Sequence, residues 1–230
     1  DKMINNFLYD GLELKYFDKA FNFRNYQLEL VKKFIRGKVA EVGPGNGAFL
    51  KNYLTLADQI DLFEPSENFL INLNKFKDPK VNIVNKYFKK NKDYYDTILY
   101  LDVLEHIKDD KMEIKTAFES LNKGGALVIN VPAFQHLYSE FDKDVDHCRR
   151  YSKKTLKSLT TNIDFTSTKL IYFDSIGYIL SIASKLITKN YLNNFDKKIK
   201  IWDSLIPLSK IIDLLTLNRF GKSLIMICIK

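Results

Sequence analysis

Three alternating glycines at the end of a short apolar run are the residues of this chain best suited to hold a ligand. Gly43, Gly45 and Gly47 follow residues 39–42, and this pattern predicts a strand that enters a tight turn opening a helix. Glycine has no Cβ, so the backbone can take positive φ and a nucleotide-sized molecule can lie directly against it. The carboxylate of Glu41, beside the turn, would repel a pyrophosphate but attract a cation. We therefore expect a positively charged nucleoside here, and the alternative is a purely structural turn.

A second apolar segment, residues 59–66, contains Glu64 about twenty residues after the turn. An acid at the carboxyl end of the second strand of a nucleoside-binding sheet can accept hydrogen bonds from both ribose hydroxyls. Glu64 is therefore expected to bind a ribose. The alternative is a solvated acid at the strand end, or the cap of a helix that begins near Pro65 and Ser66.

Three further segments follow the same pattern of strand and turn. Strands are expected at 81–84 and 95–101, and a buried strand follows the turn at Gly124-Gly125. The strand at 95–101 leads into Asp102-Val103-Leu104-Glu105-His106-Ile107. With the two segments above, these resemble, in their order, the motifs of the class I S-adenosylmethionine-dependent methyltransferases. The resemblance covers residues 39–132.

This resemblance implies an α/β fold, with a Rossmann-like seven-stranded sheet and helices on both faces. It also implies S-adenosylmethionine as the cofactor, which leaves as S-adenosylhomocysteine, and it directs Asp102 at the methionine part. The cofactor contacts implied in this way are Glu41, Gly43, Pro44, Gly45, Asn46, Gly47, Phe63, Glu64, Pro65, Ser66, Lys86, Tyr87, Asp102 and Val103.

Lys86 departs from the family, which commonly has an acidic residue after the third strand. That acid accepts a hydrogen bond from the adenine amino group, and a lysine cannot. Adenine would then be bound by backbone groups around Lys86 and Tyr87, or by stacking on an aromatic ring.

We expect a single domain over residues 1–230 with four parts. These are an N-terminal helical lid (1–36), a cofactor-binding core (37–171), a helical insert (172–220) and a last strand (221–230). Arg24 and Tyr26 of the lid are expected to face the substrate. The alternative for the aromatic residues of the lid is packing in the core.

The insert contains two strongly apolar stretches within residues 176–215, and both are too short to span a bilayer. One interpretation packs them as a helical cap over the pocket or as the face of a homodimer. The other places an interfacial helix, flanked by lysines, on an anionic membrane. Both interpretations remain open.

Past the fifth strand the chain reads His147-Cys148-Arg149-Arg150-Tyr151-Ser152. Two guanidiniums offer fixed donors for a carboxylate or phosphate, so Arg149, Arg150 and Tyr151 are expected to bind the substrate. The string resembles a bacterial subgroup of these methyltransferases found near surface-saccharide and lipid pathways. In the alternative, the arginines pair with Asp142, Asp144 and Asp146 and fasten the loop.

Histidines are the candidates for a general base because their unperturbed pKa lies near neutrality. His147 is the first candidate, since it sits with the arginines, and His106 is the second. Asp142, Asp144 and Asp146 alternate like the start of a calcium loop. However, His147 stands where that loop needs glycine and no glutamate closes it, so we expect no metal.

The composition argues against a nucleic-acid partner despite a formal net charge of +8. Only five of the 36 basic residues are arginines, and the lysines are spread along the chain. Nucleic-acid interfaces favour clustered arginine among aromatic residues, so an RNA methyltransferase is the minor alternative. The two cysteines are far apart and lack metal-site neighbours, which favours a reducing cytoplasm, with the inner membrane face as a further location.

The expected activity is methylation of oxygen or nitrogen on a small-molecule or lipid- or saccharide-linked acceptor. The sulfonium is already activated, so transfer is an in-line SN2 displacement that depends mainly on positioning. A base matters only for a hydroxyl or a protonated amine. The competing hypothesis is a non-catalytic subunit that keeps the fold and the cofactor site.

Overall fold

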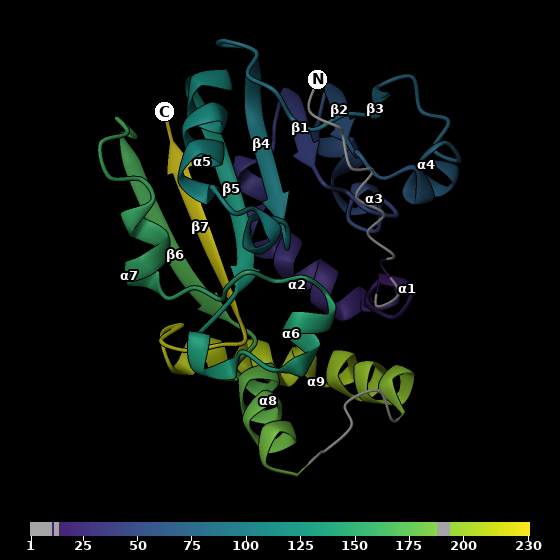
Figure 1. Cartoon of the computed structure of the whole chain (residues 1–230), viewed down its shortest axis with the longest axis vertical. Coiled ribbons are helices and arrows are strands. Elements are labelled where there is room, and N and C mark those ends of the chain that lie inside the picture. The colour runs from purple at the N-terminus through teal and green to yellow at the C-terminus, as the bar shows by residue number, and fades with distance from the viewer. Residues whose placement is uncertain (1–10, 12–13, 188–193) are drawn as a thin grey trace.

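The computed structural model describes residue 11 and residues 14–187 and 194–230, with the side chains of residues 186 and 187 excepted. Its centre is a seven-stranded sheet of order β3-β2-β1-β4-β5-β7-β6 (Figure 1). β1 to β5 run parallel, and β7 is antiparallel to both β5 and β6. The strands are β1 (Lys38–Val42), β2 (Gln59–Phe63), β3 (Val81–Val84), β4 (Tyr95–Leu101), β5 (Leu121–Pro132), β6 (Ser167–Phe173) and β7 (Ser223–Ile229).

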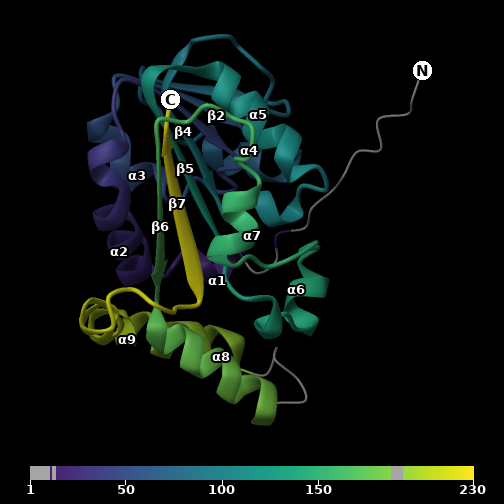
Figure 2. The same ribbon diagram turned by 90° about the vertical axis from the view of Figure 1, so that its left-hand side faces the viewer.

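Helices cover both faces of this sheet (Figure 2). One buried apolar cluster joins the sheet to α2, α3 and α4, and a second joins the opposite face to α5 and α7. The α-helices of the described residues are α1 (Leu14–Phe17), α2 (Phe21–Val31), α3 (Leu50–Tyr53), α4 (Glu67–Leu73), α5 (Asp110–Ser120), α6 (Glu140–Asp144), α7 (Lys153–Ser158), α8 (Ser175–Ile187) and α9 (Phe195–Leu215). The expected fold class is confirmed.

The strand pattern follows from burial on both faces. All side chains from Ala126 to Val131 in β5 and from Ser223 to Cys228 in β7 are buried, which explains their nearly continuous apolar sequence. β6 and β7 are neighbours in the sheet, yet α8 and α9 lie between them in the chain and pack below the sheet in Figure 1. Residues 1–10, 12–13 and 188–193, which belong to the predicted lid and insert, lie outside the described residues.

The insert is built into the domain through buried carboxylates on α9. Asp203 accepts hydrogen bonds from the amides of Phe23 (2.9 Å) and Asn22 (3.2 Å), at a helix start that has no side-chain cap of its own. The first amides of a helix have no partner within the helix and carry partial positive charge. Asp203 therefore fastens α9 to the N-terminus of α2.

Asp213 makes a second such connection near the C-terminus of α9. It is fully buried and accepts hydrogen bonds from the Asp174 amide (2.7 Å), the Ser175 amide (3.0 Å) and the Tyr26 hydroxyl (2.9 Å). These contacts fix where β6 ends and α8 begins. No helix among the described residues combines the length and apolarity that crossing a bilayer requires.

Replacing Asp213 with alanine is expected to lower the free energy of unfolding by at least about 3 kcal/mol, because three buried donors lose their acceptor. Urea denaturation followed by circular dichroism measures this change. Asp196→Ala is the matched control on the same helix, because Asp196 pairs only at the surface, with Lys19 and Lys200. Equal denaturation midpoints for the two variants would contradict the anchoring role of Asp213.

Candidate functional site

The site lies where the carboxyl ends of β1, β2 and β4 meet at one edge of the sheet. Gly43, Gly45 and Gly47 have φ values of +66°, +55° and +74°. A Cβ on Gly43 would lie 2.8 Å from a methyl of Val103, and one on Gly47 would lie 2.8 Å from the ring of Phe76. The turn therefore needs glycine both for its backbone conformation and for its contact with the loop after β4.

Glu64 joins this turn to the end of β2. One oxygen of its buried carboxylate accepts from the Gly45 amide at 3.0 Å, and the other accepts from the Ser66 amide at 2.9 Å. Burial outweighs these two hydrogen bonds and raises the pKa of Glu64 to about 7. A carboxylate oxygen can accept more than one hydrogen bond, so Glu64 can still accept from a ligand hydroxyl.

Glu41 lies beneath the turn and is almost completely buried. The Tyr53 hydroxyl of α3 donates to its carboxylate at 2.5 Å. Burial again dominates and raises the pKa of Glu41 to about 7, with the nearby Glu64 adding to the effect. Two acids at the ends of adjacent strands thus make this edge of the sheet favourable for a cation.

Asp102 follows β4 in a left-handed conformation, with φ of +59°. Aspartate adopts this conformation more readily than most residues other than glycine. Asn130 of β5 donates to its carboxylate at 2.6 Å, and the Arg24 guanidinium of α2 lies 3.7 Å from the other oxygen. Burial raises the pKa of Asp102 despite the opposing charge of Arg24.

Arg24 was expected to face the substrate, and in the structure its guanidinium lies beside Asp102; nothing in the sequence pattern indicates Asn130. The Arg24 Nε and the Asn130 Oδ1 are buried and have no hydrogen-bond partner among the described residues. Unsatisfied polar atoms are uncommon in a protein interior. A polar ligand beside Asp102 would satisfy them.

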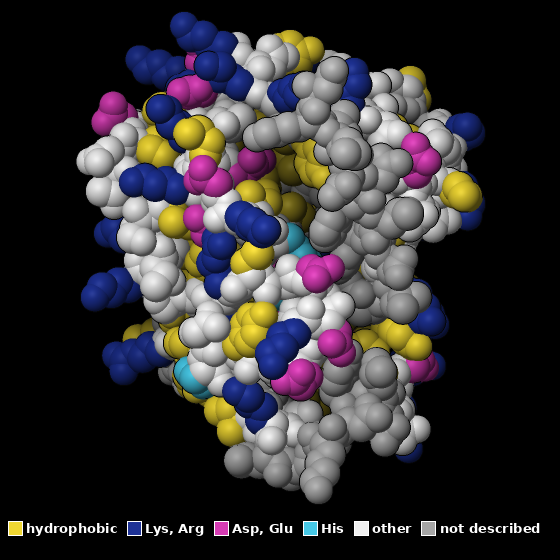
Figure 3. Space-filling view, in the orientation of Figure 1, with side chains coloured by type: hydrophobic (Ala, Val, Ile, Leu, Met, Phe, Trp, Pro, Cys, Tyr) yellow, Lys and Arg dark blue, Asp and Glu magenta, His cyan; other side chains and the backbone are white. Residues whose placement is uncertain are grey.

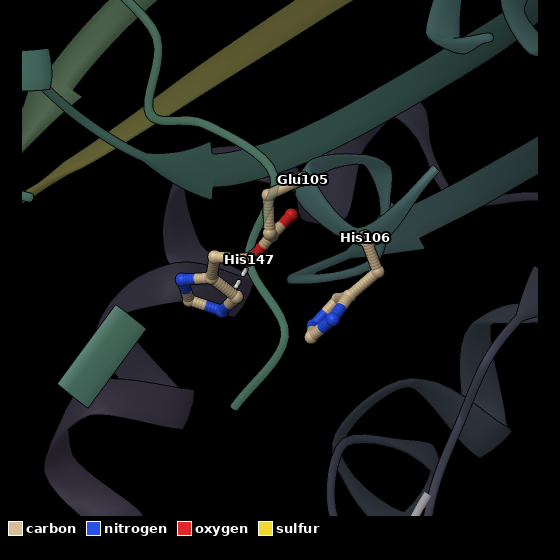
Figure 4. Close-up of side chains that lie close together, drawn as sticks. All are labelled: Glu105, His106 and His147. Carbon is tan, nitrogen blue, oxygen red and sulfur yellow. Dashed lines mark ion pairs between the residues drawn. The ribbon is translucent and has the colours of Figure 1, made fainter. Parts of the chain in front are cut away.

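A cluster of Glu105, His106 and His147 lies next to this edge (Figure 4). Glu105 and His106 belong to the turn after β4, and His147 follows α6; their side chains point toward one another. The His147 Nε2 is 3.8 Å from a Glu105 oxygen, and the two imidazole ring centroids are 4.8 Å apart. Figure 3 shows a hollow in this face of the molecule with a histidine side chain close to it. The sequence suggested both histidines but not Glu105.

The protonation of this cluster follows from burial. Burial, with the neighbouring Asp102 charge, raises the pKa of Glu105 well above its ordinary value. Burial, with the charge of His147, lowers the pKa of His106 to about 4. Asp142 differs: burial acts to raise its pKa, but hydrogen bonds from His147 and Arg150 outweigh burial and lower it to about 2.

Arg149 and Arg150 do not face the site. Arg150 is buried and holds Asp142 with two hydrogen bonds, of 2.7 and 3.0 Å. Arg149 pairs with Asp110 at 2.6 Å and also donates to two backbone carbonyls of the loop before α5. The Tyr151 hydroxyl donates to the same Asp110 at 2.8 Å. The Arg150–Asp142 pair is one that the alternative named, whereas Arg149 and Tyr151 bind Asp110, outside the acidic run. All three side chains, expected to bind the substrate, are thus occupied by contacts within the protein.

Other expected contacts are distributed around the cleft. Tyr26 is turned away from the cleft, because its hydroxyl binds Asp213. Asn46 exchanges hydrogen bonds with Asp18 and Asn72 at 2.8 Å each, and so joins the glycine turn to the chain before α2 and to α4. The remaining expected contacts are half-buried or buried, namely Pro44, Phe63, Pro65, Ser66 and Val103, or exposed, namely Lys86 and Tyr87.

Comparison with known proteins agrees with this geometry. A protein-family model described as a methyltransferase domain matches residues 14–170. No curated protein sequence matches the chain significantly. Among solved structures, a SAM-dependent methyltransferase from Archaeoglobus fulgidus superposes with a TM-score of 0.62 at 18% identity, covering 90% of this chain and 93% of the other.

Two further solved structures are similar. A possible histamine N-methyltransferase from Thermotoga maritima has a TM-score of 0.62 at 19% identity, with 95% of this chain and 94% of the other covered. Phosphoethanolamine N-methyltransferase 2 from Haemonchus contortus, in complex with phosphomonomethylethanolamine and S-adenosylhomocysteine, has a TM-score of 0.66 at 15% identity. This superposition covers 95% of this chain and 58% of the other. At these identities the likeness shows a shared fold.

The free energy of unfolding of the unchanged protein is expected to fall between pH 5 and pH 8, and it should fall less when Glu41 is replaced with glutamine. The pKa of Glu41 is about 7 in the folded chain against an ordinary 4.5. Its stabilising contribution is therefore present below pH 4.5 and is lost as the pH rises through 7, by on the order of 3 kcal/mol. Urea denaturation at both pH values measures the difference. The exposed Glu29→Gln should behave as the unchanged protein, and an equal pH dependence in Glu41→Gln would refute the assignment.

Proposed function

The chain belongs to the family of methyltransferase domains, which take their methyl group from S-adenosylmethionine. We propose that it methylates oxygen or nitrogen on a small-molecule acceptor. One observation carries the cofactor assignment. The buried carboxylate of Glu64 is hydrogen-bonded to the amide of Gly45, inside a left-handed glycine turn that leaves no room for a Cβ at Gly43 or Gly47.

The residues of the cleft fit this cofactor group by group. Glu64 would accept hydrogen bonds from the ribose hydroxyls, and the glycine turn would lie against the nucleoside. The cationic Arg24 and the polar Asn130, each with an unsatisfied atom, would bind the amino-acid end beside Asp102. When bound, the cofactor supplies a methyl group on a sulfonium that is already activated for displacement. The protein then has to hold the acceptor in line and exclude water.

The acceptor end of the cleft is assigned to the cluster of Glu105, His106 and His147. These polar groups lie next to Asp102 and face inward. Arg149 and Arg150 do not, because they make contacts with the loop. Imidazole and carboxylate groups suit an acceptor that loses a proton, such as a hydroxyl or an amine. His147 and His106 are accordingly proposed to handle that proton. Both arginines are engaged elsewhere, so they are not available to bind an anionic acceptor.

An apolar surface on α9 favours a lipid-linked acceptor. On α9, Ile201, Leu208, Ile211, Leu214 and Leu215 are all about half or more exposed. An exposed apolar helix face of this kind is typical of proteins that rest on a membrane surface or on a partner. We propose that it brings the cleft close to a lipid-linked substrate.

Calorimetric titration with S-adenosylmethionine and S-adenosylhomocysteine tests the cofactor assignment. Micromolar binding of both compounds is expected, and Gly45→Val should weaken it at least about 100-fold, because the added side chain strains the backbone and blocks the turn. Gly124→Val is the matched control. Its φ is +76°, its Cβ would make only an ordinary contact with an Arg36 nitrogen at 4.0 Å, and it lies at the opposite edge of the sheet. Absence of binding in the folded, unchanged protein would favour a relict site and the non-catalytic hypothesis.

The affinity for S-adenosylhomocysteine is expected to rise with pH up to about 8. The ribose hydroxyls donate to an ionised carboxylate, and the pKa of Glu64 is about 7. Below pH 7 binding must therefore release a proton, so the dissociation constant should increase about tenfold for each pH unit lowered. Calorimetry between pH 5.5 and pH 8.5 measures this slope, and Glu64→Gln should abolish it. A flat profile in the unchanged protein would show that Glu64 does not bind the ribose.

A further inference from the structure

Glu105 is the acid whose carboxyl group is least satisfied by hydrogen bonds among the described residues. It is completely buried, and no other described residue donates a hydrogen bond to either oxygen. Asp142 is also completely buried at its side chain, but two Arg150 nitrogens and His147 hold it. An unpaired carboxylate in a protein interior is strongly disfavoured unless a cation accompanies it. Glu105 thus lacks a hydrogen-bonded positive partner among the described residues, because the His147 Nε2, 3.8 Å away, is too distant to donate.

Each of the two histidines beside Glu105 has one ring nitrogen that is hydrogen-bonded to another group of the protein. His147 Nδ1 is 2.8 Å from a carboxylate oxygen of Asp142, so Nδ1 carries the hydrogen and the lone pair of Nε2 lies on the side of Glu105. His106 hydrogen-bonds to the backbone of Asp146. A histidine that binds a metal ion generally donates its other ring N–H to a carboxylate or a backbone carbonyl. Both histidines show this outer arrangement.

We propose that Glu105, His106 and His147 bind a divalent transition-metal ion. One ligand atom from each residue lies within 4.8 Å of the others, so an ion at the centre of that triangle would be about 2.8 Å (4.8/√3) or less from each. Small side-chain rotations would bring these distances to the roughly 2.1 Å typical of nitrogen and carboxylate ligands. Two imidazoles and one carboxylate suit Zn²⁺, Co²⁺ or Fe²⁺ and leave coordination positions open.

This set of ligands differs from the alternating acids at Asp142, Asp144 and Asp146. Those residues are not gathered around a common point: the Asp142 carboxylate is held by Arg150 and His147, and Asp146 occupies a left-handed turn with φ of +58°. Asp142 instead acts on the proposed ion indirectly, because it orients the imidazole of His147.

A cation at this position would specify the chemistry of the acceptor, and this step rests on the proposed function. An acceptor hydroxyl bound at an open position would lose its proton to solvent more readily, because a divalent cation lowers the pKa of bound oxygen groups. The oxygen then forms a bond to the methyl carbon while the carbon–sulfur bond breaks, and the electron pair returns to sulfur as a neutral thioether. A coordinated His147 Nε2 cannot accept a proton, so in the metal-bound protein the cation takes over the role that the histidines would have in its absence, and it favours O-methylation.

Titration of chelator-treated protein with Co²⁺ tests the site without any acceptor. One Co²⁺ per chain is expected, with the visible absorption bands of an ion bound by imidazole nitrogen. Glu105→Gln and His147→Ala should each weaken binding at least tenfold. His136→Ala is the matched control, because the imidazole of His136 contacts Tyr178 outside the cluster and its loss should leave binding unchanged.

Three outcomes are decisive for folded variants. Loss of Co²⁺ binding in Glu105→Gln but not in His136→Ala supports the site. No binding to the unchanged protein, or equal binding to Glu105→Gln, overturns it. S-adenosylhomocysteine titration of the same metal-free protein is expected to be unaffected, so a failed metal site is distinguishable from a failed cofactor site.

Discussion

The burial of negative charge at one edge of the sheet is the constraint on which the rest of the structure depends. Glu41 and Glu64 stand at the ends of adjacent parallel strands, and each is nearly completely buried. Glu64 is stabilised by the amides of Gly45 and Ser66, and Glu41 by the hydroxyl of Tyr53. These contacts require the left-handed glycine turn and fix the position of α3. The same concentration of acid makes the edge complementary to a cofactor that is cationic and lacks phosphate.

The strands, and the edge of the sheet expected to bind the cofactor, were predictable because the local sequence pattern determines them. Buried parallel strands have continuous apolar sequences, and glycine with positive φ has a distinct signature in Gly43, Gly45 and Gly47. Glu64 was predictable from its distance to that turn. The resemblance to a methyltransferase supplied the roles of these residues, whereas the burial of their charges is visible only in the structure.

The acceptor side was less predictable because its contacts are distant in sequence. Arg149 binds Asp110, which lies 39 residues earlier, and no local rule chooses that partner over an acid of the adjacent run. Asp203 and Asp213 contact α2 from 180 or more residues away, and the Asp213 contact turns Tyr26 from the cleft. In the sequence Glu105 is an ordinary acid before a histidine, and only the structure shows that its carboxyl oxygens have no hydrogen-bond partner among the described residues.

A crystal structure of the protein with S-adenosylhomocysteine tests the central claim most directly. We expect both ribose hydroxyls to donate to the carboxylate of Glu64, while Gly45 keeps its amide contact and the amino-acid end lies between Arg24 and Asp102. A nucleoside bound away from Glu64, or a Glu64 carboxylate that contacts only the protein in the complex, would contradict it.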